Sequence, residues 1–138
     1  MVKTTYLTLS TRGNTDVQEI TSLISRAVEE SGFENGVVVV FTPSSTSAIT
    51  TIEYEPGCIS DLRQLLEEWI PSGRDYAHNY RWGDHNGHSH LRAAILGPSL
   101  TIPFVERRLS LGTWQQVIFI DFDVRPRQRR LVVQILGA

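Results

Sequence analysis

The sequence predicts a single α+β domain, with a largely antiparallel sheet or sheets and two or three helices. The chain has 138 residues, the usual size of a domain with one core. Hydrophobic residues make up 41% of the chain and charged residues 20%, as in globular proteins, so a packed core is expected. Strand-like segments dominate the C-terminal half and two helical patterns precede them, an order that favours an α+β fold.

The N-terminal third is predicted to contain two strands separated by a helix. Residues 3–10 alternate polar and apolar side chains, a pattern typical of a strand that could lie at a sheet edge. From Thr15, a Thr-Asp-Val-Gln capping box and apolar residues at helical spacing predict a helix that ends at Gly32. Residues 37–41 are a continuous apolar run, which predicts a buried, central strand.

The remaining two thirds are predicted to contain a strand, two helical segments and three further strands. Residues 48–54 form the first of these strands, and apolar side chains at i, i+3, i+4 and i+7 within residues 62–69 predict a helix. Residues 72–87 are polar and contain glycine, so we expect a long loop of the kind that tends to be functional. A short helix-compatible segment covers residues 90–97. The three C-terminal strand candidates are residues 99–105, 112–123 and 129–136.

Charge and cysteine content restrict the classes of partner and site. The formal net charge of -2 argues against nucleic acid, and the basic run at residues 125–130 is explained by a solvated hairpin turn. Cys58 is the only cysteine, so a metal site must rely on His, Asp or Glu. The N-terminus has no secretion-signal pattern, and no apolar run approaches the roughly 18 residues of a membrane span. We expect a cytoplasmic protein without nucleic-acid or membrane partners.

Three of the four histidines lie within six residues of the segment WGDHNGHSH. Imidazole nitrogens bind zinc and related divalent metals. His88 and His90 would face the same side on a strand but would diverge by about 200° on a helix, so their spacing permits a ligand pair without requiring one. His78 could complete a three-histidine set that leaves an open position for water or substrate. The alternative is four surface histidines in a polar loop.

Two carboxylates and a run of hydroxyls are further candidates. Asp84 and Glu53 could be metal ligands, a general base or loop caps, and Asp84 is preferred as the catalytic group. The hydroxyls of Ser45, Thr46 and Ser47 could bind a phosphate, although a strand follows them and the lysine of a phosphate loop is missing.

Arginine and tryptophan side chains could hold the rest of a phosphorylated ligand. Arg92 and Arg108 offer forked donors for a phosphate, and Trp114 could stack on a flat ring. A surface position is the commoner fate of a single arginine, and a buried or interface position that of a tryptophan. Arg74, Arg81 and Trp82 could serve in the same ways.

Several motifs along the chain resemble those of one known family. They are HSHL at residues 88–91, LGPSLT at 96–101, LGTWQQ at 111–116, TSA at 46–48 and TIE at 51–53. In these motifs the chain is similar to the YjbQ-like family, also called the secondary thiamine-phosphate synthase family. The resemblance spans essentially the whole chain and indicates a single YjbQ-like domain over residues 1–138.

The resemblance implies a fold, an assembly and an activity. The fold would be an α+β sandwich that trimerises about a threefold axis, so a second and third copy of the chain are the expected partners. The activity would be a weak thiamine-phosphate synthase. The resemblance also implies that His78, His88 and His90 hold a divalent metal, for which zinc is expected, and it places Gln115 with Trp114 at the substrate.

The chain departs from the family pattern at three places. Ser45 stands where many relatives carry a histidine, and His88 could supply the missing ring. His85 stands where relatives more often have glycine, so it is not counted among the ligands. Glu106 and Arg107 replace the usual glycine of a hairpin turn, which lies apart from the site.

Three functions follow from the same residues. The first is a transferase that joins a pyrimidine carried on pyrophosphate to a thiazole phosphate, with Arg92 and Arg108 stabilising the departing pyrophosphate. The second is a metal-dependent hydrolase in which Asp84 or Glu53 moves the proton of a bound water. The third is a trimeric binding module whose metal orders the long loop. A small phosphorylated ligand is expected in the first.

Overall fold

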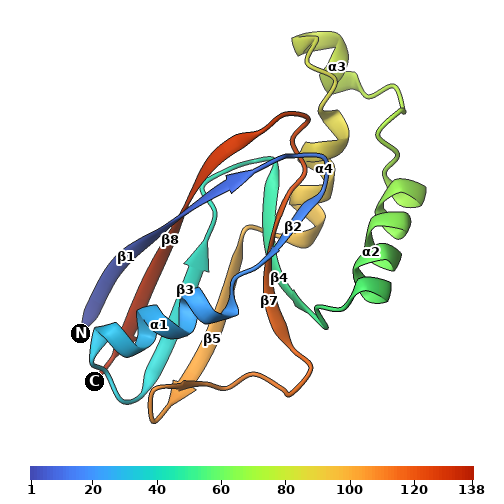
Figure 1. Ribbon diagram of the computed structural model, residues 1–138. Helices are drawn as coiled ribbons and strands as arrows, with labels where there is room; N and C mark the ends of the chain where they lie inside the picture. Colours follow the sequence, from blue (N-terminus) through green and yellow to red (C-terminus); the bar gives the residue numbers. More distant parts are fainter.

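The computed structural model describes residues 1–138 and contains two antiparallel sheets and four helices (Figure 1). The predicted α+β class is confirmed, with one helix more than expected. None of the helices is long and apolar enough to span a membrane. The large sheet, in spatial order, consists of β1 (Val2–Thr11), β8 (Arg127–Gly137), β3 (Gly36–Phe41), β5 (Ser99–Val105) and β6 (Arg108–Leu109). The small sheet consists of β2 (Asp16–Glu19), β7 (Gln116–Asp121) and β4 (Ser47–Ile52). The helices are α1 (Thr21–Ser31), α2 (Pro56–Trp69), α3 (Ala77–Trp82) and α4 (Gly87–Leu96).

The small sheet is buried on both faces and divides the interior into two cores. Phe119 of β7 points toward the large sheet and α1, where it joins Ile24 and Val38 in the larger core. Ile118 and Ile120, on the opposite face of β7, pack in a second core with side chains of α2 and α4. Because a strand covered on both faces needs apolar side chains at successive positions, β7 has an unbroken apolar run.

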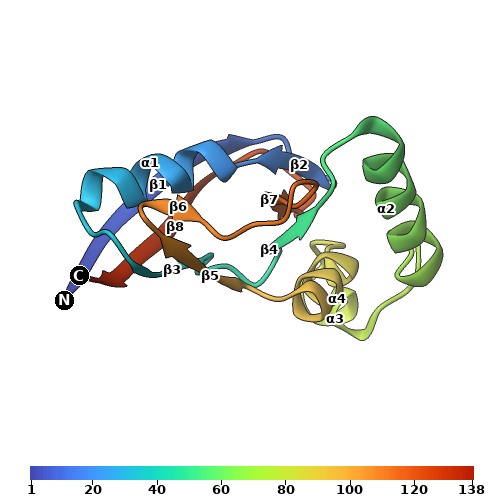
Figure 2. The ribbon, with the colours of Figure 1, turned by 90° about the horizontal axis from the view of Figure 1, so that it is seen from below.

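The large sheet is covered by α1 on one face, and no helix lies against the other (Figure 2). On this outer face Val37 and Val39 are half-buried and Phe41 is 40% exposed. Residues 37–41 do form a central strand, but the prediction that they are buried is wrong for the outer face. Their apolar run is typical of a strand that is buried on both faces, whereas within a single chain only one face of β3 is covered.

The N-terminal boundary of the first helix differs from the prediction. Residues 16–19, expected to be helical, form β2, and Val17 pairs with Ile120 of β7. The helix begins at Thr21 without a side-chain cap, so the capping box predicted at Thr15 does not form. Pairing with a distant strand outweighs the local helical pattern here. Gly32 ends the helix in the left-handed conformation, as predicted.

The second helix buries only part of the face that its spacing suggested, since Leu62 and Leu66 pack in the second core. Ile59 and Leu66 are buried, but Leu65 and Trp69 are 49% and 65% exposed. The Glu55 carboxylate caps the first turn by accepting hydrogen bonds from backbone N–H groups.

The chain between this helix and the C-terminal strands is more helical than predicted. Residues 72–87 were expected to be a loop, and they contain α3, which ends at Gly83 in a left-handed conformation. The next helix, α4, begins at Gly87 and therefore includes both His88 and His90. A Cβ atom at Gly87 would lie 2.7 Å from Cβ of Tyr76, so glycine permits the close packing before α4.

The C-terminal strands agree with the prediction in number but not in every boundary. Residues 99–105 form β5 as predicted. β7 occupies only half of residues 112–123, because residues 112–115 turn. β8 begins at Arg127, so the basic run is only partly a turn and continues into a strand.

We expect replacement of Glu106 by glycine to stabilise the protein. Glu106 and Arg107 form the turn between β5 and β6 with φ angles of 51° and 65°, a conformation that side chains disfavour. Glu106→Gly should raise the free energy of unfolding by about 1 kcal/mol, or the melting temperature by about 3 °C. Glu106→Ala is the matched control, because it removes the same side chain but keeps Cβ. Equal melting temperatures of these two variants would contradict the explanation.

Candidate functional site

The structure brings two of the predicted histidines together. His78 lies in α3 and His90 in α4, and their ring centroids are 4.4 Å apart. Nδ1 of His78 is buried and has no hydrogen-bond partner, and a carboxylate oxygen of Asp84 lies 3.6 Å from it. The pair therefore places two imidazoles and one nearby carboxylate at the junction of two helices.

The surroundings of His90 keep its ring neutral. Burial lowers the pKa of His90 below its ordinary value, because the charged form loses hydration, and the neighbouring His78 lowers it further. Asp84 and Asp123 raise this pKa but do not reverse the change. At neutral pH the ring of His90 can therefore accept a proton or coordinate an ion.

The expected three-histidine set is not assembled within one chain. His88 lies in the same helical turn as His90, and side chains two positions apart on a helix diverge by about 200°. His88 is only 4% exposed, and burial followed by the charge of Arg92 lowers its pKa. No group of three or more His, Cys, Asp or Glu side chains is arranged to hold a metal ion. His85 is exposed in the loop before α4, with φ of 56°.

Two adjoining hollows border His90. We name the larger one, of about 360 Å³, the polar hollow, and the other, of about 270 Å³, the alanine hollow. Ser44, Ser45 and His90 line both, so the hollows meet at these three residues. The polar hollow is further lined by Pro43, Thr46, Asn86, Asp123, Arg127 and Arg129, and the alanine hollow by Ser47, Ala93, Ala94 and Pro98.

The predicted hydroxyl residues lie at these hollows. Ser45 is exposed, and its hydroxyl makes no hydrogen bond within the chain. Thr46 is buried, and its hydroxyl accepts a hydrogen bond from Nη2 of Arg129 at 2.8 Å. The Ser47 hydroxyl lies 2.9 Å from that of Thr42. Ser45 is therefore the hydroxyl that is free to meet a ligand, while the other two fix the shape of the turn.

Two arginines and an aspartate of the polar hollow were not predicted to be site residues. Nε and Nη2 of Arg127 donate to Asp123 at 3.0 and 2.7 Å, and those of Arg129 donate to Asp121 at 2.8 and 2.9 Å. The bond with Asp121 raises the pKa of Arg129. The spacing of Arg127 and Arg129 in the basic run could have indicated this pair, because residues two apart on a strand share a face. The predicted strand began at Arg129, whereas β8 begins at Arg127 and so includes both arginines.

The carboxylate of Asp123 is held in its charged form. Burial raises its pKa, but hydrogen bonds from the backbone N–H of Val124, from Asn86 and from Arg127 together bring the pKa below its ordinary value. The amide nitrogen of Asn86 donates to this carboxylate at 3.2 Å. Asp123 therefore anchors the polar groups around it.

Arg92, one of the predicted catalytic residues, lies away from the hollows. Nε and Nη2 donate to the carbonyl of Ile70, Nη1 donates to Thr15, and Nη2 also donates to Glu67 at 2.9 Å. All three guanidinium nitrogens are thus occupied by protein atoms. Arg92 ties α4 to the end of α2 and has no donor directed at a ligand.

Of the remaining predicted residues, three lie at the far end of the small sheet and Arg108 lies in the large sheet. Glu53 follows the C-terminal end of β4, and the hydroxyl turn precedes the N-terminal end. The six residues of β4 therefore separate them by about 20 Å. Gln115 donates to the Thr51 hydroxyl at 3.2 Å, and Trp114 beside it is 71% exposed. Arg108 is exposed in β6. Within one chain, the predicted residues are therefore not gathered at a single site.

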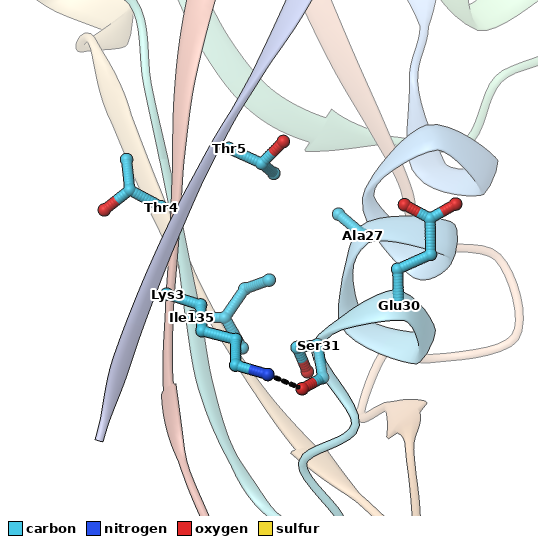
Figure 3. Close-up of a pocket in the computed structure, with 7 residues that line it drawn as sticks. All are labelled: Lys3, Thr4, Thr5, Ala27, Glu30, Ser31 and Ile135. Carbon is cyan, nitrogen blue, oxygen red and sulfur yellow. Dashed lines mark hydrogen bonds between the residues drawn. The ribbon is translucent and has the colours of Figure 1, made fainter.

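A third hollow, of about 220 Å³, lies between β1 and α1 (Figure 3). Lys3 lines it, but its Nζ donates to the backbone carbonyl of Ser31 at 2.6 Å. None of the predicted site residues reaches this hollow. The hollows beside His90 are therefore the better candidate site.

The chain matches known proteins along its whole length. The family model described as UPF0047 protein YjbQ-like matches residues 5–138. A UPF0047 protein from Methanothermobacter thermautotrophicus is 41% identical over 136 residues, which cover 99% of this chain and 93% of that protein. A UPF0047 protein from Archaeoglobus fulgidus is 38% identical over 130 residues, covering 94% of this chain and 98% of that protein.

Solved structures show the same fold at a similar level of identity. A YbjQ-like protein of unknown function from Sulfolobus solfataricus superposes with a TM-score of 0.90 at 31% identity and covers 100% of both chains. A hypothetical protein from Aeropyrum pernix K1 gives a TM-score of 0.91 at 34% identity, with 99% of both chains covered. The chain belongs to the UPF0047 family of YjbQ-like proteins.

Proposed function

We propose that this protein is an enzyme that converts a small phosphorylated ligand at His90. The observation that carries the proposal is the pair of adjoining hollows that meet at this neutral imidazole. One hollow is polar and charged, and the other is lined in part by alanine. A ligand with a phosphate at one end and a ring at the other matches this division, since binding sites combine apolar walls with a few placed polar groups.

The reaction that the family resemblance favours is the synthesis of thiamine phosphate. The ring nitrogen of a thiazole phosphate would form a bond to the methylene carbon of the pyrimidine, while the bond from that carbon to the pyrophosphate oxygen breaks. The Ser45 hydroxyl would donate a hydrogen bond to the departing oxygen. The neutral ring of His90 would hold the reacting groups in place beside it.

We also propose that a divalent metal, with zinc expected, binds at the histidine pair. His78 fits this role because its buried Nδ1 has no other partner, and His90 fits it because its ring is neutral. Asp84 is the carboxylate nearest to the pair. When bound, the ion would stabilise negative charge on the leaving group.

A hydrolase is the second candidate, and the position of Asp84 favours it. Its carboxylate lies 3.6 Å from Nδ1 of His78 and is half exposed to solvent, so it could accept a proton from a water beside the pair. Glu53 does not share this position, because it lies at the far end of the small sheet.

A homotrimer is the proposed assembly, and the outer face of the large sheet supports it. This face exposes several apolar side chains that one chain leaves uncovered, a feature typical of protein interfaces. Its largest exposed members include Val2, Tyr6, Phe41, Val105 and Leu136. A hollow of about 320 Å³ on the same face is lined by Val39, Phe41, Val132 and Gln134.

The metal proposal predicts which histidines determine zinc content. Purified protein should contain zinc by elemental analysis, and His78→Ala or His90→Ala should remove most of it because each deletes one imidazole donor. His85→Ala is the matched control, since it removes an exposed imidazole from the adjacent loop. His88→Ala should retain zinc and lower the melting temperature. Full zinc content in His90→Ala would contradict the site.

The catalytic proposal predicts a His90-dependent reaction. Incubation with the pyrimidine pyrophosphate and the thiazole phosphate should yield thiamine phosphate, detected by chromatography. His90→Ala should reduce the rate by about 100-fold, a usual effect of removing a group at the reacting centre. His85→Ala should retain the rate. Equal product with wild type and His90→Ala would exclude this reaction.

The second candidate would be favoured instead by hydrolysis of simple phosphate esters that is sensitive to chelator and is lost in Asp84→Asn.

The assembly proposal predicts that a charged side chain introduced on the outer face of the large sheet lowers the mass of the assembly. By light scattering, the wild type should have about three times the chain mass of 15.6 kDa. Phe41→Glu should shift it toward the monomer, because burying an unpaired carboxylate in an apolar interface is unfavourable. Leu65→Glu, at a similarly exposed position on α2, should leave the mass unchanged. A monomeric wild type would overturn the assembly.

A further inference from the structure

The basic run at residues 125–130 has no role in the function proposed so far. Within β8, Arg127 and Arg129 share the face that lines the polar hollow. Arg130 belongs to the opposite face, with its guanidinium 3.7 Å from the ring centroid of Tyr6. Because side chains alternate between the two faces of β8, these two arginines line the same hollow.

The two arginines are held rigidly and still have free donors. Each uses Nε and Nη2 on an aspartate, Asp123 for Arg127 and Asp121 for Arg129. Nη1 of each makes no hydrogen bond within the chain, and neither atom is among the buried unpaired groups, so both keep some exposure to solvent. A guanidinium fixed along one edge offers its remaining donors in a defined direction.

The Ser44–Ser45 turn provides donors at the same hollow. The backbone N–H groups of both serines make no hydrogen bond within the chain, and neither does the Ser45 hydroxyl. Free backbone N–H groups and hydroxyls are the partners that phosphate oxygens accept from. The one carboxylate that lines the hollow, Asp123, already accepts from Arg127, Asn86 and Val124, so its charge is largely satisfied.

We infer that the polar hollow is a phosphate subsite. A phosphomonoester dianion binds there to Nη1 of Arg127 and Arg129 and to the Ser44–Ser45 turn, while Asp121 and Asp123 are positioning residues that orient the two guanidiniums. The inference deepens the proposed function and rests on it for the remainder of the ligand, whose ring would occupy the alanine hollow. It also assigns the phosphate contacts to other arginines than Arg92, since Arg92 is buried and each of its three guanidinium nitrogens is hydrogen-bonded within the chain.

The test is binding of inorganic phosphate, measured by calorimetry in the presence of chelator. Wild-type protein should bind phosphate with a dissociation constant of about 10 mM or below, because a few directed donors give modest affinity. Arg127→Gln should weaken binding at least tenfold. Arg130→Gln is the matched control, because it removes the same charge from the opposite face of the strand, and it should bind as the wild type does.

Further variants separate loss of the subsite from loss of the fold. Asp123→Asn with Arg127→Gln removes both members of an ion pair, and phosphate binding should still be lost while the melting transition remains cooperative. Ser45→Ala, at an exposed side chain without contacts, should weaken binding about threefold. Phenyl phosphate should bind more tightly than inorganic phosphate, because its ring can enter the alanine hollow.

The outcomes distinguish this inference from the proposed function. Equal affinity of Arg127→Gln and Arg130→Gln for phosphate, or no binding by the wild type, overturns the phosphate subsite even if zinc binds and turnover occurs. Phosphate binding that depends on Arg127 in a protein without turnover or zinc supports the subsite and rejects the enzyme proposal alone. Equal affinity for phenyl phosphate and inorganic phosphate rejects the role of the alanine hollow.

Discussion

A buried ion pair between Asp121 and Arg129 fixes the corner where the two sheets meet. Asp121 ends β7 of the small sheet and is fully buried, and Arg129 reaches it from β8 of the large sheet. Breaking such a pair leaves an uncompensated buried charge, at a cost of about 3–5 kcal/mol. Thr11 of β1 donates to the same carboxylate, and Thr46 accepts from Arg129. The position of the hydroxyl turn, and so of both hollows, depends on this pair.

The second constraint is the fixed position of α4, which sets the roles of its side chains. Arg92 ties the helix to the end of α2, and the Ser89 hydroxyl donates to the carbonyl of Phe122. With the helix held at these points, His90 borders the hollows, whereas His88 is buried and does not line them. The backbone N–H groups of Asn14 and Thr15 donate to the carbonyls of Asp123 and Asp121, and both residues have positive φ angles, so strained backbone also lies beside the site.

Local pattern was sufficient for the elements that are marked by their own periodicity or by a terminating glycine. The end of the first helix at Gly32, the strand at residues 99–105 and the short helix near residue 90 follow from periodicity and from glycine conformation. The hydroxyl turn and His90 were recognisable as candidate site residues from residue type and motif. The strand at residues 16–19 was not, because its stability comes from pairing with β7, about 100 residues away.

The sequence by itself determined the α+β class, the family and the segments that carry the candidate chemistry, since these follow from residue type and local spacing. Only the tertiary structure decided that His88 turns away from His90. It also decided that the guanidinium of Arg92 is hydrogen-bonded within the chain, and that Arg127 and Arg129 line the polar hollow instead. The physical reason is that the role of a charged side chain depends on which groups form hydrogen bonds and ion pairs with it. Those groups come from strands and helices that the fold, and not the order of residues, brings together.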